Sequence, residues 1–192
     1  MEKPEIETFY PSSPKAWRRW LQKNHAKADA VWVIFYKKSS GKPTLSWSEA
    51  VDEALCFGWI DSTKKTLDEE RSIQFFTRRK AQSTWSKINK AKVERLIEED
   101  LMMPAGQASI DRAKENGSWT ILDAVEELTI PKDLEKAFKS RPGSKDFFLS
   151  LSKSVRKMML HRIVMAKRED TRAKRITEIA DSMGEKKRMK GF

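Results

Sequence analysis

Two clear patterns of hydrophobic and polar positions mark the first forty residues. Ser13 and Pro14 predict the start of a helix, because serine is a preferred N-cap and proline is favoured at the first helical position. Trp17 and Trp20 then recur at the spacing of one helix face, so this face is expected to pack on a core. The β-branched and aromatic run VWVIFYKK, residues 31–38, predicts a strand.

The next segment combines a helix with a pair of strands. Ser46 and Glu49 have the spacing of a capping box, in which each side chain accepts from the backbone amide of the other residue. The helix that they begin is expected to stop at Gly58. Residues 59–65 and 72–78 predict the two strands of a hairpin, joined by the charged segment LDEE.

The second half of the chain is dominated by helical periodicity. Further helices are predicted to start at Ser86, Pro104 and Pro131. Two hydrophobic stripes at helical spacing follow: Val155, Met159, Ile163 and Ala166, then Ala173, Ile176, Ile179, Ala180 and Met183. The predicted fold class is therefore α+β, with a small, mainly antiparallel sheet and packed helices, followed by a helical C-terminal part. The boundary is expected near residues 120–130.

Composition limits the class of protein. A hydrophobic content of 39% and seven tryptophans are enough to build a core, and no apolar run reaches the roughly 18–20 residues that a membrane span needs. The first residues, MEKPEIETFYPSS, contain no apolar signal segment, so we expect no secretion. Cys56 is the single cysteine, which excludes a disulfide framework and suits a reducing compartment. We expect the protein to be cytoplasmic.

The net charge of +11 is concentrated near the C-terminus. Residues 151–192 carry 13 Lys and Arg against 5 Asp and Glu, a net of +8. Such asymmetry can indicate binding to a phosphate backbone, although the solvated side of two helices has the same composition. The candidate basic surface consists of Lys153, Arg156, Lys157, Lys167, Arg168, Arg172, Lys174 and Arg175.

The sequence gives little support to metal, cofactor or catalytic chemistry. Cys56, His25 and His161 are far apart on different predicted elements, so we expect no metal site. Neither GxGxxG nor a Walker-type GxxxxGK[ST] is present, and we expect no cofactor. No catalytic residue is assigned, and these patterns favour a protein that is not an enzyme. The least favoured alternative is an enzyme in which Asp61 acts as a base.

The run TRRKAQSTWSKIN, residues 77–89, is the strongest candidate for a binding site. It joins a predicted strand to a helix N-terminus, where free amides, serine hydroxyls and adjacent arginines favour an anion. Asp61, on the neighbouring strand, could orient Arg78 or Arg79 through a paired fork. The candidate ligand-binding residues are Trp59, Asp61, Arg78, Arg79, Ser83, Trp85, Ser86 and Asn89. The alternative is purely structural: an ordinary helix cap, core tryptophans and an ion pair across the hairpin.

Five ordered motifs resemble a known family. They are ALCFGWIDS (54–62), FTRRKAQSTWSKIN (76–89), LMMPAG (101–106), AKENGSW (113–119) and AKREDTRAKRI (166–176). Together they resemble the YdeI/OmpD-associated family, also described as bacteriocin-protection proteins. The resemblance implies a bacterial protein linked to tolerance of antimicrobial peptides. It also implies a YdeI-like α+β domain at 1–125 and a helical, basic, OmpD-associated-type region at 126–192, packed on the first.

These observations favour a non-catalytic binding protein of a stress response. Its Arg/Ser/Trp pocket would recognise a small anionic ligand or an acidic group on a protein partner. The alternative is a nucleic-acid-binding protein that uses the basic C-terminal helices, although no helix-turn-helix, RNP or KH signature supports base readout.

Overall fold

The structure, a computed structural model, describes residues 6–187 and divides the chain into two compact units. The first unit ends at Trp119 and the second begins at Thr120. The expectation that no secretion signal is present rests partly on residues 1–5, which lie outside the described range. Within that range, no helix has both the length and the apolar character needed to cross a membrane.

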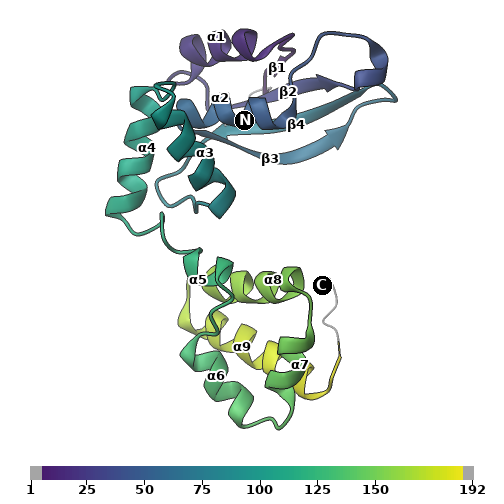
Figure 1. Cartoon of the computed structure of the whole chain (residues 1–192), viewed down its shortest axis with the longest axis vertical. Helices are drawn as coiled ribbons and strands as arrows, with labels where there is room; N and C mark the ends of the chain where they lie inside the picture. The colour runs from purple at the N-terminus through teal and green to yellow at the C-terminus, as the bar shows by residue number, and fades with distance from the viewer. Residues whose placement is uncertain (1–5, 188–192) are drawn as a thin grey trace, which may run out of the picture. The chain divides into compact units, whose positions relative to one another are not determined.

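A four-stranded sheet forms the centre of the first unit (Figure 1). In spatial order its strands are β1 (Thr8–Phe9), β2 (Ala30–Tyr36), β4 (Arg71–Arg78) and β3 (Trp59–Thr66). β2, β4 and β3 are antiparallel neighbours, whereas the short β1 runs parallel to β2. The predicted strand, the predicted hairpin and the mainly antiparallel sheet are confirmed.

The helices of the first unit begin and end where the capping residues predict. They are α1 (Pro14–Asn24), α2 (Trp47–Cys56), α3 (Lys87–Glu98) and α4 (Pro104–Glu115). Ser13 Oγ accepts from the Ala16 amide at 3.2 Å and caps α1. The capping box of α2 is complete, because Ser46 Oγ accepts from the Glu49 amide at 3.2 Å and the Glu49 carboxylate accepts from the Ser46 amide at 2.7 Å.

The core of the first unit lies between α1, α2 and one face of the sheet (Figure 1). Val31, Val33 and Phe76 point to this face and are fully buried, as alternation along a strand requires. Trp17 and Trp20 of α1 stack on each other at 5.2 Å above it. The predicted Trp face of the first helix is therefore the face that packs on the core.

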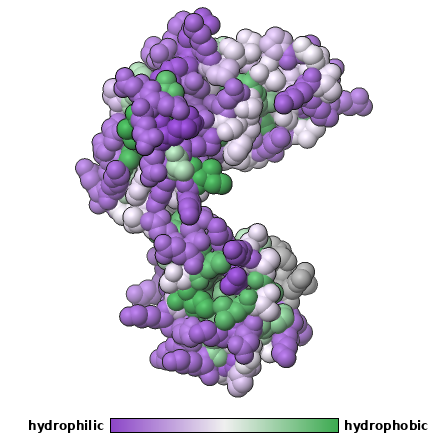
Figure 2. Space-filling view, viewed as in Figure 1, coloured by the Kyte–Doolittle hydropathy of each residue, from purple (hydrophilic) through white to green (hydrophobic). Residues whose placement is uncertain are grey.

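The second unit is a set of helices around its own core. They are α5 (Asp123–Glu126), α6 (Lys132–Lys139), α7 (Ser144–Ser150), α8 (Lys153–Val164) and α9 (Glu169–Gly184). The core includes Phe138, Phe148 and Met159. Hydrophobic side chains also reach the surface of this unit (Figure 2). Met158 of α8, for example, is 43% exposed.

Most of the two predicted stripes is buried in the second unit, but Val155 is half-buried and two alanines depart from the pattern. Met159 and Ile163 of the first stripe are fully buried, as are Ile179, Ala180 and Met183 of the second. Ala173 is exposed, and Ala166 lies beyond the end of α8. Periodicity failed there because alanine is small enough to fit either face of a helix. The predicted α+β fold class, with a helical C-terminal part, is confirmed.

Candidate functional site

The segment TRRKAQSTWSKIN contains the end of β4, a turn and the start of α3. The Arg79 amide donates to the Gly58 carbonyl oxygen at 2.9 Å, which holds the chain beside the end of α2. A turn follows, closed by a hydrogen bond from the Lys80 amide to Ser83 Oγ at 3.1 Å. These two hydrogen bonds fix the backbone on both sides of Arg79 and thereby set the direction in which its side chain leaves the chain.

The Arg79 guanidinium is buried and stacked on an aromatic ring. Its central carbon lies 3.6 Å from the centroid of the Trp85 ring, which is a close cation–π contact. Nη1 donates to the Thr84 carbonyl oxygen at 3.1 Å. Nε and Nη2 are shielded from solvent and have no hydrogen-bond partner among the described residues. The side chain is only 6% exposed, and most of its donor capacity is unused.

Burial also disfavours the charge on this side chain. Loss of solvation lowers the pKa of the Arg79 guanidinium to about 10, and the negative charge of Asp61 partly opposes that decrease. The group still carries its proton at neutral pH. The first unit therefore contains a buried cation that forms no ion pair with the described carboxylates, an arrangement that an anion would stabilise.

A cavity of about 240 Å³ lies beside this cation, between the end of α2 and α4. The polar side chains that line it are those of His25, Arg78, Arg79, Ser109 and Arg112. Its lining includes no carboxylate. Arg79 and Arg112 form no ion pair with the described carboxylates, whereas Arg78 pairs with Asp29 at 2.6 Å. The cavity is therefore electropositive.

The other predicted site residues around Arg79 form the frame of the junction. Trp59 and Trp85 are core residues, 0% and 1% exposed, and Trp59 Nε1 donates to the His25 carbonyl oxygen at 3.2 Å. Ser86 caps α3 by accepting from the Asn89 amide at 3.3 Å, so Asn89 occupies the third helical position as predicted. These contacts are the ones that a structural role requires.

The predicted fork between Asp61 and an arginine is wrong. Asp61 Oδ2 instead accepts from Trp47 Nε1 at 2.9 Å and from Gln74 Nε2 at 3.0 Å. Arg78 donates instead to Asp29 at 2.6 Å. Asp29 directly precedes β2, which lies on the opposite side of β4 from the strand that carries Asp61. Trp47 and Gln74 are donors from α2 and from the neighbouring strand, and sequence alone did not place them beside Asp61.

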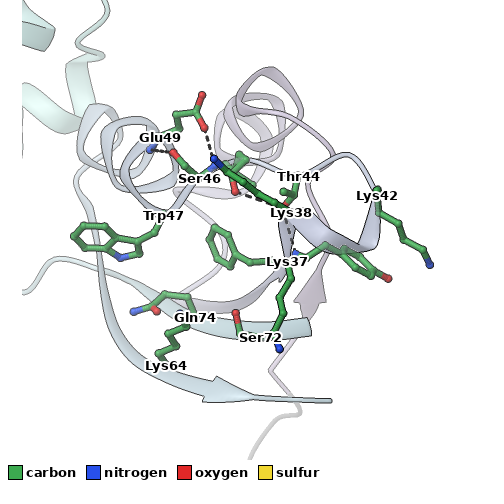
Figure 3. A pocket seen from close by; sticks show the side chains of 14 residues that line it. Lys37, Lys38, Lys42, Thr44, Ser46, Trp47, Glu49, Lys64, Ser72 and Gln74 are labelled. Carbon is green, nitrogen blue, oxygen red and sulfur yellow. Dashed lines mark hydrogen bonds between the residues drawn. The ribbon is translucent and has the colours of Figure 1, made fainter. Parts of the chain in front are cut away.

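A larger cavity, of about 680 Å³, lies at the opposite end of β4 and was not predicted (Figure 3). It is bounded by the loop after β2, the start of α2 and the ends of β3 and β4. Asp61 borders this region through its bonds to Trp47 and Gln74, both of which line the cavity. The sequence signal that could have indicated it is the lysine-rich segment KKSSGK at 37–42.

The candidate basic residues of the second unit differ in their surroundings. Lys157 pairs with Glu126 at 2.5 Å, and Arg172 forms a two-point contact with Asp133 at 2.7 and 3.0 Å. Arg175 donates to a backbone carbonyl oxygen, and Arg156 is partly buried. The exposed members are Lys153, Lys167, Arg168 and Lys174. Contacts within the unit therefore neutralise part of the predicted basic surface.

Cys56 is expected to resist alkylation in the folded protein. Its side chain is 0% exposed, and burial raises the pKa of the thiol to about 11, although the charge of Arg18 opposes this. At about pH 8, only about one molecule in a thousand would carry the reactive thiolate. Iodoacetamide labelling followed by mass spectrometry tests this, with the urea-unfolded chain as the control that reacts fully. Rapid labelling of the folded chain would contradict it.

Comparison with protein families finds two matches along the chain. Residues 9–109 match the family described as "Domain of unknown function (DUF8412)", and residues 127–186 match the family described as "Bacteriocin-protection, YdeI or OmpD-Associated". The second match contains the motif at 166–176, whereas the first contains those at 54–62, 76–89 and 101–106. Comparison with curated proteins and with solved structures gives no match.

Proposed function

The chain belongs to the family of the domain of unknown function DUF8412 and carries a bacteriocin-protection, YdeI or OmpD-associated domain in its helical unit, and from this premise we propose that it is a non-catalytic binding protein. The protein acts in the bacterial cytoplasm, in a stress response that includes tolerance of antimicrobial peptides. Its binding site is the electropositive cavity at Arg79, and the ligand is a small anion or an acidic group on a protein partner.

The buried, unpaired guanidinium of Arg79 is the observation that supports this proposal. Nearly all buried polar groups in proteins have hydrogen-bond partners, and a buried charge without an opposite charge is uncommon. A buried titratable group with a strongly shifted pKa beside a cavity is a candidate functional residue. Arg112 adds a second positive charge to the same cavity, whereas the charge of Arg78 is paired with Asp29 at 2.6 Å.

The size of the cavity limits the ligand. Sites for drug-sized molecules usually measure about 300–1,000 Å³, so a volume of about 240 Å³ suits a small anion or the anionic end of a larger partner. Arginine binds phosphate and carboxylate through two parallel hydrogen bonds, which favours these two groups over halides. Nε and Nη2 of Arg79 have no partner among the described residues, and since both are shielded from solvent, they can form such a pair only after the side chain turns toward the cavity.

Thermal unfolding in the presence of anions tests the proposal. Inorganic phosphate, acetate and a peptide with a free C-terminal carboxylate are the probes. At 100 times its dissociation constant, a ligand stabilises by about 2.7 kcal/mol, which raises the Tm by roughly 5–10 °C for a chain of this size. We expect this shift in the wild type and in the exposed control Arg19→Met, and its loss in Arg79→Met.

The same variants separate a binding role from a structural one. The decrease in the pKa of Arg79 to about 10 corresponds to about 3 kcal/mol against the buried charge. The stacking on Trp85 stabilises the charged form by about 2 kcal/mol, and the hydrogen bond to Thr84 by about 1.5 kcal/mol. Together they offset the unfavourable effect of burial. Arg79→Met should therefore change the unligated free energy of unfolding by less than about 1 kcal/mol.

Two results would contradict the proposal. A loss of more than about 3 kcal/mol in Arg79→Met, without any anion effect in the wild type, would make Arg79 a structural residue. Binding of a short oligonucleotide that falls steeply with salt and survives Arg79→Met would instead support the alternative site on the basic helices of the second unit.

A further inference from the structure

The larger cavity of the first unit has walls of two chemical kinds. Figure 3 shows Trp47, Gln74 and Lys64 on one side and the loop with Lys37 and Lys38 on the other. The volume of about 680 Å³ is in the range of sites that hold a whole small molecule. It lies at the opposite end of β4 from Arg79 and shares no lining residue with the smaller cavity.

Both sides of the cavity carry positive charge that the described residues do not neutralise, on the loop and at Lys64 of β3. Lys37, Lys38, Lys42 and Lys64 line the cavity, and none of them forms an ion pair with a carboxylate of residues 6–187. Glu49 is the one carboxylate of the lining, and its oxygen is engaged by the Ser46 amide in the capping box. The cavity therefore attracts an anion with more than one negative charge.

The loop that carries three of these lysines is held in place at several points. The Tyr36 amide donates to Thr44 Oγ1 at 3.3 Å, and the Lys37 amide donates to the Glu70 carbonyl oxygen at 2.8 Å. The Tyr10 hydroxyl donates to the carbonyl oxygen of Pro43. The backbone of the lysine wall is thus fixed before any ligand arrives, which lowers the entropic cost of binding.

The aromatic wall presents a fixed, exposed ring. Trp47 is 51% exposed, although tryptophan side chains in proteins are usually largely buried. Its Nε1 donates to Asp61 at 2.9 Å, and Asp61 also accepts from the buried Gln74, so the indole orientation is set from below. Phe35 and Tyr36 add further ring surface to the lining. An oriented, exposed indole is a platform for a flat ring.

We propose that this cavity binds a small molecule that joins a flat ring to a multiply charged phosphate group, the chemistry of a nucleoside triphosphate. The ring stacks on Trp47 and the phosphates lie against the lysines, which act as point charges rather than as a glycine-rich cradle. An inorganic anion alone would leave the aromatic wall and most of the volume unused. The proposal does not depend on the function proposed for the Arg79 cavity.

Calorimetric titration of the full chain tests the proposal, at about 50 mM salt, where phosphate contacts are strongest. ATP, tripolyphosphate, adenosine and a short oligothymidylate are the four probes. We expect ATP to bind at least about fivefold more tightly than tripolyphosphate, because stacking adds to the charge attraction. Adenosine should bind more weakly than ATP by a still larger factor.

Substitutions then assign the two walls separately. Trp47→Leu should weaken ATP at least about fivefold and leave tripolyphosphate unchanged, whereas Trp47→Phe keeps a ring and stays within about threefold of the wild type. The double variant Lys38→Gln/Lys64→Gln should weaken both ATP and tripolyphosphate by roughly tenfold. The matched control is Lys15→Gln/Lys23→Gln on α1, which removes the same charge from exposed positions outside the cavity.

Three outcomes would overturn the proposal. Equal affinity for ATP and tripolyphosphate, unaffected by Trp47→Leu, would show a simple anion site. Tighter binding of oligothymidylate than of ATP, lost in the same variants, would assign the cavity to single-stranded nucleic acid. Absence of ATP binding at millimolar concentration would refute a nucleoside triphosphate as the ligand of this cavity. Arg79→Met should not alter ATP binding, so failure here is distinguishable from failure of the Arg79 site.

Discussion

Replacing Trp17 by alanine should lower the free energy of unfolding of the first unit by about 3–5 kcal/mol. The side chain is 0% exposed and contacts Trp20 and Phe76, with ring centroids 5.2 and 5.4 Å away. Its Nε1 donates to the Ala50 carbonyl oxygen at 3.0 Å, so α1 and α2 lose a buried bond as well.

Tryptophan fluorescence during urea unfolding measures this loss for the first unit alone. All seven tryptophans lie at or before residue 119, so the second unit does not contribute to the signal. The control is Trp47→Ala, since Trp47 is 51% exposed and should cost no more than about 1 kcal/mol. Similar losses in the two variants would contradict the assignment of Trp17 to the centre of the core.

Replacing Gly106 by alanine should destabilise the first unit by about 2–3 kcal/mol. Glycine to alanine inside a helix normally stabilises by roughly 0.5–1 kcal/mol, so the sign is expected to reverse here. A Cβ on Gly106 would lie 2.3 Å from the Cys56 carbonyl oxygen and 2.7 Å from its carbonyl carbon. These are backbone atoms, which cannot rotate away, and α2 and α4 would have to separate.

Gly184 provides the matched control. It is the last residue of α9, and a Cβ there would meet only the side chain of Arg141 at an ordinary 3.5 Å. Gly184→Ala should leave the free energy of unfolding unchanged or raise it by up to about 1 kcal/mol, as followed by circular dichroism. If Gly106→Ala behaved in the same way, the close approach of α2 and α4 would be refuted.

Local sequence signals were sufficient for most elements of the fold. The serine caps of α1 and α3 and the capping box of α2 are satisfied within a few residues of chain, so their hydrogen bonds follow from spacing alone. Strand alternation places Phe76 on the opposite face of β4 from Phe75, but only the structure shows that this face is the one packed on the core. The short α7 was not predicted as a separate helix, because its signals are weak between two stronger periodic segments.

The candidate site was predicted less completely, because its contacts connect segments distant in the chain. The sequence indicated Arg79 and Trp85 together, and their stacking joins residues only six positions apart. The partners of Asp61 are Trp47 and Gln74, which lie 14 and 13 positions away, and no local pattern identifies them. The larger cavity was missed for the same reason, since its walls come from three strands, a loop and a helix.

By itself, the sequence determined which segments are helices and strands, which faces are apolar and where charge accumulates. These properties depend on neighbours within one or two turns of helix or along one strand. Only the tertiary structure decided which charges are buried, paired or left without a partner. Burial and long-range pairing depend on how the elements pack, and they left Arg79 enclosed and the lysines beside Trp47 open to a ligand.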